Sequence, residues 1–426
     1  MIRQIAAVRG MNDILPADMA PWQRLERTAR ELLEAYGYAE FRVPAVEHTE
    51  LFERAIGEHT DVVEKEMYTF TDQGGESLTL RPEATAGMVR AVIEHGMLRG
   101  QRHKLWCMGP MFRHEKPQKG RFRQFHQVDV EAIGFAGPDV DAELIALTAR
   151  LWSRLGIRRI SLQLNSLGTA DSRRAYRALL TDYFRAQQGR LDADSRRRLE
   201  GNPLRILDSK NPEMQELIAG APLLTEHLDA QSRAHFDALR AVLEGMGIPY
   251  RVNPRLVRGL DYYSRTVFEW ITDALGAQDA VCSGGRYDGL IEQLGGESTP
   301  AVGFALGVER AVALLRLTGE PGVARPPDVY VIASGERAGQ AVWRLIESLR
   351  DALPERRFEL GLGGGAFKAQ FRRADRSGAP LALILGDEEL ARGCAALKPL
   401  RHEAGQSEYP LEALAGRIEA ALDSPE

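Results

Sequence analysis

Hydrophobic and polar residues alternate with two different periods along the first third of the chain. Between positions 19 and 36 apolar residues recur every three or four places and Gly37 follows, which predicts an amphipathic helix ending near this glycine. The segments 104–115 and 123–134 are instead typical of strands, and the loop between them carries Lys119 and Arg121. We therefore expect an antiparallel pair of strands joined by a basic loop.

Helical periodicity dominates a long middle stretch, from about residue 171 to residue 250, where strand-forming residues are few. We predict that this stretch is a helical insertion. Strand character returns at 263–271. The segment 302–317 is predicted to form one helix, in which Gly303 and Gly307 lie one turn apart and allow close backbone approach.

A change of composition separates the last hundred or so residues from the rest. The segment 318–327 has the glycine and proline content of a linker. Beyond it, 328–426 alternates short apolar runs with helical segments, as in a small α/β domain. The pattern thus predicts two domains, 1–322 with its insertion at about 171–250, and 328–426.

Bulk composition excludes several classes of protein. With 44% hydrophobic and 27% charged residues over 426 positions, the chain is expected to fold as a soluble globule. Its net charge of -5 means that any nucleic-acid binding must rely on local basic patches. No signal peptide or apolar run of membrane-spanning length is evident, so we expect a cytoplasmic protein without membrane contact. The spacing of Cys107, Cys282 and Cys394 suits neither zinc nor disulfides, which predicts buried thiols.

Strand periodicity places candidate chemistry on one face of the predicted pair. Gln127 and Glu131 share a face, and Arg113 on the preceding strand joins them if the two strands pair in register. A guanidinium beside an amide and a carboxylate suits a zwitterionic or phosphorylated ligand. From periodicity alone, however, a surface ladder of cross-strand ion pairs is the favoured alternative.

Two further segments have the composition of a binding pocket. Positions 256–263 combine Arg258 with the adjacent tyrosines Tyr262 and Tyr263, and positions 282–289 contain the paired glycines Gly284 and Gly285, which permit positive φ and close approach to a ligand. Each segment taken alone is also typical of a turn. The glycine cluster at 361–365 lacks the Ser or Thr of a phosphate loop, which predicts a flexible loop.

Taken in order, these segments resemble the histidyl-tRNA synthetase family of class II aminoacyl-tRNA synthetases. Segments 112–131 and 303–310 are similar to the second and third class II motifs, and 41–70, with Pro44, to the dimer-forming first. Segments 256–263 and 283–289 resemble the two histidine-specific motifs, and 79–85 resembles the amino-acid-binding strand. Neither signature of class I enzymes is present. Five motifs in the family's order are far more specific than any one of them.

The resemblance implies an α+β fold, with an antiparallel-sheet catalytic core, a helical insertion near the acceptor arm of the tRNA, and a C-terminal α/β domain that reads the anticodon. The implied reaction is ATP-dependent ligation of L-histidine to tRNA(His) through a histidyl-adenylate, with release of AMP and diphosphate. ATP is then a substrate, and Mg²⁺ is expected on its outer phosphates, although the sequence shows no dedicated metal ligands. The resemblance also implies a homodimer.

The resemblance also assigns roles to individual residues. The histidine-binding set is Glu83, Thr85, Gln127, Glu131, Tyr262 and Tyr263, of which Glu83 and Thr85 would face the α-ammonium group while Glu131 and the tyrosines would surround the ring. Arg113 and Arg258 would act as electrostatic stabilisers at the α-phosphate and carboxylate, and Arg113, Arg121 and Arg310 would bind ATP. Ala84 stands where the family often has glycine, a change we expect to be tolerated.

Two other readings remain for the catalytic core. The regulatory subunit of short-form ATP phosphoribosyltransferase resembles it and senses histidine without catalysis, but typically lacks the anticodon domain and the ATP-binding arginines. Both features are present here, in the residues after Pro327 and in Arg113, Arg121, Arg258 and Arg310. A synthetase for another amino acid, such as threonine or proline, is disfavoured by the 258–263 segment.

Contacts with RNA are left open by the sequence. The run 196–198 is entirely arginine and suits either RNA phosphates or a solvated helix face. Basic residues near Phe367 and Phe371 suit stacked anticodon bases, but we expect these two rings to belong to the core. Whether Gln118, Lys119 and Arg121 contact the extra guanosine of histidine tRNA stays open, and His114 and His126 are predicted to be structural.

Overall fold

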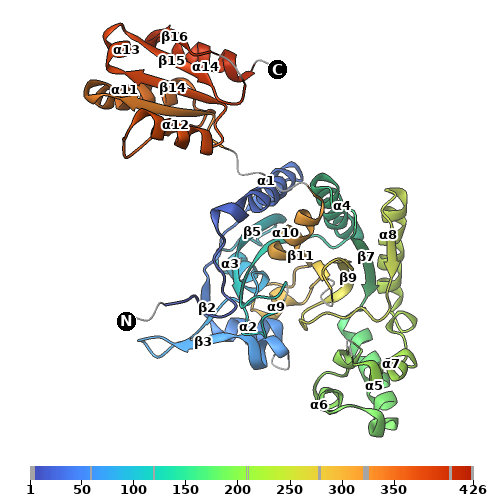
Figure 1. The fold of residues 1–426 in the computed structure, drawn as a ribbon. Coiled ribbons are helices and arrows are strands. Elements are labelled where there is room, and N and C mark those ends of the chain that lie inside the picture. Colours follow the sequence, from blue (N-terminus) through green and yellow to red (C-terminus); the bar gives the residue numbers. More distant parts are fainter. Residues whose placement is uncertain are drawn as a thin grey trace. The chain divides into compact units, whose positions relative to one another are not determined.

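The computed structural model describes residues 5–57, 60–118, 120–207, 209, 211–276, 280–319, 326–402 and 405–423. The chain forms two compact units, Met1–Gly322 and Val323–Glu426. Figure 1 shows the ribbon of each unit, and each is described by itself. Most of the predicted linker, residues 320–325, lies outside the described residues.

A large, mostly antiparallel sheet forms the centre of the first unit. Its described strands follow the order β1 (Ala39–Glu40), β5 (His103–Phe112), β6 (Gln124–Ile133), β11 (Ala301–Gly307), β10 (Ala280–Arg286), β9 (Ser264–Ile271), β7 (Ser161–Ser166) and β8 (Tyr250–Val252). The two outermost pairs are parallel and the inner pairs antiparallel. The predicted antiparallel pair is confirmed as β5 and β6, with Met111 opposite Phe125 and Gly109 opposite Gln127.

Helices cover one face of this sheet and bury an apolar core against it (Figure 1). They are α1 (Met19–Ala35), α4 (Pro138–Leu155), α8 (Ala230–Gly245) and α10 (Val308–Leu317). In α1 the fully buried residues Leu25 and Leu32 lie two helical turns apart, on the side that meets the core. The helix predicted from this spacing is therefore confirmed to within one residue at its end.

Smaller elements cover the opposite face and enclose a second core. These are α2 (Thr49–Ile56), α3 (Thr85–Glu94), α9 (Leu290–Gln293) and a three-stranded sheet in the order β2 (Val46–His48), β4 (Ser77–Leu80) and β3 (Tyr68–Thr71). The buried side chains of Phe52, Met88, Met111 and Tyr287 belong to this core. The first turn of α3 lies against the polar side of β6, which is where the candidate site is found.

The middle of the chain is helical, but not all of it leaves the core. Helices α5 (Ala170–Ala186), α6 (Ala193–Gly201) and α7 (Gln215–Ala219) lie together beyond the main sheet in Figure 1. Thr169 and Asp192 cap the first two by accepting hydrogen bonds from Ser172 and Ser195. Helix α8 instead buries Phe236 and Leu239 in the first core, so the protruding part ends before it.

The single helix predicted over 302–317 is wrong. Strand β11 occupies Ala301–Gly307 and helix α10 begins at Val308. Gly303 pairs with Glu131 across the sheet, and a β-carbon at Gly303 would lie 1.7 Å from the Glu131 Oε2 atom. Cross-strand crowding, which the local sequence does not reveal, therefore explains this glycine better than helix packing.

The second unit is a small α/β structure built on one sheet. Its described strands follow the order β13 (Phe358–Leu360), β12 (Val329–Ser334), β14 (Leu381–Gly386), β15 (Cys394–Pro399) and β16 (Ser407–Pro410). Helices α11 (Glu336–Ala352), α13 (Asp387–Ala391) and α14 (Leu414–Asp423) accompany one apolar core, and α12 (Phe367–Arg376) packs over another. The apolar runs predicted as strands are confirmed as β12 and β14, and the glycine cluster precedes α12 as a loop.

The expectation of buried thiols is met by two of the three cysteines. Cys107 and Cys282 are buried as free thiols, whereas Cys394 is only half-buried, which corrects the expectation for that residue. None of the described helices combines the length and the apolar character that crossing a membrane requires.

Candidate active site

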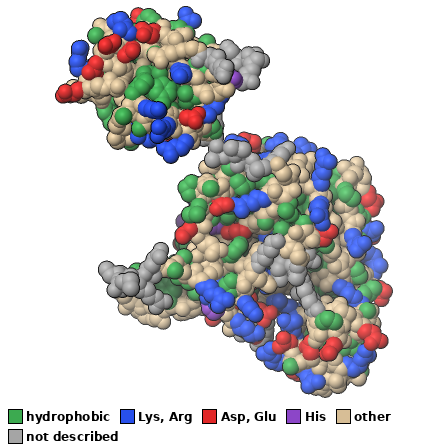
Figure 2. Space-filling model, in the orientation of Figure 1, with side chains coloured by type: hydrophobic (Ala, Val, Ile, Leu, Met, Phe, Trp, Pro, Cys, Tyr) green, Lys and Arg blue, Asp and Glu red, His purple; other side chains and the backbone are tan. Residues whose placement is uncertain are grey.

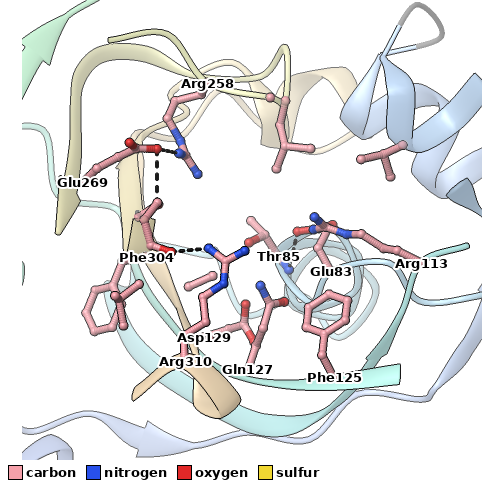
Figure 3. Close-up of a pocket in the computed structure, with 18 of the residues that line it drawn as sticks. Glu83, Thr85, Arg113, Phe125, Gln127, Asp129, Arg258, Glu269, Phe304 and Arg310 are labelled. Atoms are coloured by element: carbon pink, nitrogen blue, oxygen red, sulfur yellow. Dashed lines mark hydrogen bonds and ion pairs between the residues drawn. The ribbon is translucent and has the colours of Figure 1, made fainter. Parts of the chain in front are cut away.

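A cavity of about 380 Å³ opens on the polar side of strands β6, β10 and β11. Figure 3 shows side chains from these strands, from the start of α3 and from the 256–263 loop pointing into it. The structure brings together in its wall every site residue that the sequence predicts: Glu83, Thr85, Arg113, Arg121, Gln127, Glu131, Arg258, Tyr262, Tyr263 and Arg310. The surface ladder of ion pairs is therefore wrong for β5 and β6, since their polar face lines a cavity.

Carboxyl groups and their donors form one end of the cavity. Glu83 precedes α3, and its two oxygens accept the backbone N–H groups of Thr85 and Ala86, each at 2.9 Å. The first N–H groups of a helix have no acceptor within the helix, so they are free to bind the Glu83 carboxylate. These two hydrogen bonds fix the position of the carboxylate. Burial raises the pKa of Glu83, and the two backbone hydrogen bonds oppose that shift.

Glu131 lies deeper at the same end and is 1% exposed. Its Oε1 accepts a 2.6 Å hydrogen bond from the Thr85 hydroxyl, and its Oε2 accepts one from the Tyr287 hydroxyl. Burial raises the pKa of Glu131 to about 8, because the charged form is poorly solvated there, and the nearby Glu83 adds to this shift. Glu131 can thus carry a proton, or release it, near neutral pH.

Three tyrosine rings form a wall beside these carboxyl groups. The ring centroids of Tyr262 and Tyr263 lie 4.7 Å apart, and those of Tyr262 and Tyr287 lie 5.7 Å apart. Burial raises the pKa of all three phenols, so each stays a neutral donor that can pair with a buried acceptor. Apolar rings with polar tips suit a flat, polar heterocycle.

Guanidinium groups also line the cavity, and Figure 3 shows Arg113 close to Glu83 and Arg258 beside Glu269. The Arg113 Nε donates to the Pro82 carbonyl at 2.9 Å, and its guanidinium lies over the Phe125 ring at 5.3 Å. Arg258 pairs with Glu269 and lies 5.5 Å from the Tyr263 ring centroid. These contacts hold the planar cations in place before any ligand arrives.

The basic loop between β5 and β6 contributes the remaining cations. Arg121 forms a 3.1 Å ion pair with Glu115, and the Arg310 Nε donates to the Gly120 carbonyl at 3.1 Å. Helix α10 and the loop are thereby joined in the wall of the cavity. Gln118 pairs with Arg121 in an isolated β-bridge, whereas Lys119 lies outside the described residues.

Asp129, Tyr287 and Glu269 are among the cavity residues to which the sequence analysis assigned no role. Asp129 lies between Gln127 and Glu131 on one face of β6. Because alternate residues of a strand share a face, the sequence alone could have placed Asp129 in the cavity wall. Tyr287 lies in the segment 282–289, just after the paired glycines, and could likewise have been predicted as a site residue. Glu269 gives no local signal, because its pairing with Arg258 exists only in the fold.

The paired glycines themselves have a different role from the one expected. Gly284 and Gly285 lie inside β10 with ordinary strand backbone, so neither adopts the positive φ that glycine permits. A β-carbon at Gly284 would lie 2.3 Å from the Gly303 carbonyl oxygen, and one at Gly285 would lie 2.5 Å from the Thr266 oxygen. The close approach seen here is that of neighbouring strands, and approach of a ligand to these glycines stays a prediction.

The two histidines of this region make protein contacts. The His126 Nδ1 lies 2.9 Å from a Glu309 oxygen, and its ring meets Trp22 edge to face at 5.2 Å. The His114 ring meets Tyr68 in the same way at 5.5 Å. Neither forms part of the described cavity wall.

The architecture now defines a class of enzyme. An antiparallel sheet that carries arginines on a strand–loop–strand unit and on a following strand–helix unit is the core of a class II aminoacyl-tRNA synthetase. The sequence model of histidyl-tRNA synthetase matches residues 10–311, and that of an anticodon-binding domain matches residues 328–421. The chain belongs to the histidyl-tRNA synthetase family, and its reaction is the ATP-dependent ligation of histidine to tRNA.

Solved structures agree with this assignment. The apo histidyl-tRNA synthetase of S. aureus is 36% identical, with a TM-score of 0.82 over 98% of this chain and 100% of that one. A histidyl-tRNA synthetase from Nostoc sp. is 19% identical, with a TM-score of 0.69 over 98% and 100% of the two chains. A Bacillus halodurans protein described as an ATP phosphoribosyltransferase regulatory subunit/histidyl-tRNA synthetase shares the fold at 21% identity, with a TM-score of 0.65 over 91% and 99%.

Proposed function

We propose that the cavity binds L-histidine against its buried carboxyl groups and ATP against its arginines, and forms histidyl-adenylate between them. The observation that carries this proposal is that one cavity wall holds both kinds of group, the carboxyl groups of Glu83 and Glu131 and the guanidinium groups of Arg113, Arg258 and Arg310. Figure 3 shows Arg113 close to Glu83, and Arg258 paired with Glu269. Histidine needs both kinds of group, because its ammonium group and ring N–H can meet carboxylates while its carboxylate can meet guanidinium groups.

Adenylation brings two anions together. A carboxylate oxygen of histidine attacks the α-phosphorus of ATP, the bond from that phosphorus to the bridging oxygen breaks, and diphosphate leaves. Arg113 and Arg258 would offset the repulsion and bind the charge that develops on the α-phosphate. Both are already held by protein contacts, so aligning the reactants can supply up to about 7–11 kcal/mol of the barrier.

The remaining roles follow from position in the cavity. Glu83 and Thr85 would hold the α-ammonium group, and Gln127 would orient the amino acid. Glu131, Tyr262 and Tyr263 would surround the imidazole, whose two ring nitrogens require polar partners in a buried site. Arg121 and Arg310, which also line the cavity, would bind the outer phosphates of ATP.

Mg²⁺ is part of this proposal as a companion of the ATP phosphates. The described residues contain no group of three or more acidic, histidine or cysteine side chains able to hold a metal ion. Mg²⁺ in nucleotide sites commonly uses one or two carboxylates together with phosphate oxygens. Glu115 and Glu269, both in the cavity wall, fit that need, and the bound ion would offset phosphate charge.

We propose that tRNA(His) contacts both units. Next to the active-site cavity lies a second one of about 280 Å³, lined by Arg173, Arg174, Arg177 and Arg205, among others. In Figure 2 basic side chains gather around the hollow beside the insertion, which suits the phosphates of an acceptor end. The match of the second unit to anticodon-binding domains supports anticodon recognition there.

The Phe367 ring of the second unit lies at the surface, although it was expected to belong to the core. Phe367 is 45% exposed, so the prediction that it belongs to the core is wrong, whereas Phe371 packs against the core beneath α12. The two ring centroids lie 4.9 Å apart, and the Lys398 ammonium lies 5.1 Å from the Phe371 ring. An exposed ring beside a cation is suited to stacking on an unpaired base.

A cytoplasmic homodimer completes the proposal. The exposed apolar side chains of Val46 and Phe70, in the segment resembling the dimer-forming motif, support the homodimer. Light scattering of the purified protein at micromolar concentration should give twice the chain mass of 47.3 kDa. A mass of one chain would contradict the dimer.

Histidine-dependent exchange of pyrophosphate into ATP tests the reaction, with the other nineteen amino acids as controls. Exchange with histidine alone is the expected result, followed by charging of tRNA(His). A histidine-sensing regulatory subunit, the alternative weighed from the sequence, would bind histidine without supporting exchange. The 36% identity to a synthetase and the matched anticodon-binding domain favour the enzyme.

A further inference from the structure

The 256–263 loop is held from behind by side chains of the helical insertion. Several side chains of the loop line the active-site cavity, and Figure 3 shows Arg258 reaching into it. The backbone carbonyls of Gly259, Asp261 and Tyr263 instead accept hydrogen bonds from two arginines of the insertion. The loop thus has one side that meets the cavity and another that meets the insertion.

Arg173, near the start of α5, makes two of these contacts. Its Nη1 donates to the Asp261 carbonyl at 3.2 Å and also to the Tyr263 carbonyl. Burial lowers the pKa of Arg173, and the charge of Asp261 opposes this shift. Because a buried cation is costly unless hydrogen bonds satisfy it, the two carbonyls form a specific site for this guanidinium.

A second part of the insertion reaches the same loop. Arg205, in the short helical turn that follows α6, donates to the Gly259 carbonyl. The side-chain amide of Asn202 donates to the Asp261 Oδ1 atom at 2.9 Å. Two segments of the insertion that are separate along the chain therefore converge on the loop.

An unusual backbone conformation joins the end of the loop to the start of the insertion. Arg265 has a φ of 47°, and it is the one non-glycine residue with positive φ in the described part of the chain. Its N–H donates to the Gly168 carbonyl at 2.8 Å, and its carbonyl accepts the Leu167 N–H at 2.6 Å. Such a conformation costs energy and persists where surrounding contacts hold it. Leu167 and Gly168 precede α5 directly, so the loop and the insertion are also tied through their backbones.

We propose that Arg173 and Arg205 are positioning residues for adenylation, which hold the 256–263 loop so that Arg258 meets the reacting α-phosphate. This inference rests on the proposed role of Arg258 in forming histidyl-adenylate. It gives the insertion a part in a step that precedes any transfer to tRNA. A misplacement of about 1 Å can cost a reaction about 100-fold in rate, so the loss of one support of the loop should be measurable.

Single-turnover formation of histidyl-adenylate, measured without tRNA, tests the inference in a double-mutant cycle. We expect Arg173→Met to lower the rate about tenfold, with less than about a threefold change in the affinity for ATP. In an Arg258→His background the same substitution should lower the rate by less than about twofold, because the group that Arg173 positions is then absent. A residue that only stabilises the fold would lower both rates by the same factor.

A conservative variant and a matched control accompany the cycle. Because one nitrogen of Arg173 serves both carbonyls, the ammonium group of Arg173→Lys can replace it, and the rate should stay within about threefold of wild type. Arg185→Met removes an exposed guanidinium from the same helix, where it pairs with Glu200, and should leave the rate unchanged. Should Arg173→Met fail to fold, Arg205→Met provides the cycle with the same expected pattern, since Arg205 supports the loop beside Arg258.

Three results would overturn the inference. Wild-type rates for both Arg173→Met and Arg205→Met would show that the loop needs neither arginine. Equal fold losses with and without the Arg258 guanidinium would show that these arginines do not act through it. Near-normal adenylate formation by Arg258→His alone would leave no group to be positioned. Failure of the proposed function is distinguishable from all three, because the wild-type protein itself would then form no histidyl-adenylate.

Discussion

The Thr85 hydroxyl donates a 2.6 Å hydrogen bond to Glu131 Oε1, and so ties the first residue of α3 to the middle of the cavity floor. The same residue gives its backbone N–H to Glu83. One threonine therefore fixes the positions of two carboxylates that are separated by most of two strands and a helix. This arrangement lets the pocket be formed before histidine binds, which reduces the entropy lost on binding.

Removing this hydroxyl should loosen the pocket without unfolding it. Thr85→Val keeps the shape of the side chain and leaves one Glu131 oxygen without its donor. We expect the KM for histidine in pyrophosphate exchange to rise by about tenfold, with little change in the KM for ATP. Thr85→Ser retains the hydroxyl and should stay within about threefold of wild type. Equal KM values for the serine and valine variants would show that the hydrogen bond has no part in binding.

Arg258 is predicted to stabilise charge in adenylate formation. Arg258→His removes a fixed guanidinium from the cavity and should lower the rate of adenylate formation about 100-fold or more in single-turnover experiments. Arg251→His, at an exposed position on β8, is the matched control and should be neutral. Near-normal adenylate formation by Arg258→His would remove this role from the arginine.

The raised pKa of Glu131 predicts how stability depends on pH. The folded protein holds this proton up to about pH 8, whereas the unfolded chain releases it near 4.5, so the folded state binds more protons between these values. Glu131 therefore favours folding below pH 4.5, and this contribution is lost as pH rises to about 8. Relative to Glu131→Gln, the wild-type free energy of unfolding should fall over this window, on the order of a few kcal/mol.

Urea unfolding at pH 5, 6.5 and 8 measures this difference. Trp22, Trp106, Trp152 and Trp270 all lie in the first unit, so a Trp343→Phe background makes tryptophan fluorescence report that unit alone. Parallel pH profiles for the wild type and Glu131→Gln would mean that Glu131 titrates normally in the folded protein.

Gly303 should not tolerate even one added carbon. In Gly303→Ala the β-carbon would meet Glu131 Oε2 at 1.7 Å and the Val130 carbonyl at 2.5 Å, which forces the strands or the carboxylate to move. We expect a loss of about 1–3 kcal/mol in the free energy of unfolding, together with weaker histidine binding. Gly245→Ala, in α8 with open space around the site of the β-carbon, should be neutral or slightly stabilising. Identical unfolding of both variants would contradict the crowding seen between β6 and β11.

Local pattern was sufficient for much of the fold. The spacing of Leu25 and Leu32 predicts α1, and the alternation along 123–134 predicts both β6 and the shared face of Gln127 and Glu131. These predictions succeed because the period of side chains along a helix or strand is a property of the backbone itself. Arg258, Tyr262 and Tyr263 were likewise recognisable from their order in the sequence.

Tertiary structure decided what local pattern left open. The spacing of Gly303 and Gly307 is compatible with a helix, and only the neighbour Glu131 across the sheet shows why Gly303 lies in a strand. The pairing of Arg258 with Glu269, and the lack of a hydrogen-bond partner for the Asp129 carboxyl among the described residues, are likewise properties of the folded cavity. Sequence determines which faces are polar, but packing determines which polar groups are satisfied, because hydrogen bonds and burial join residues that are distant along the chain.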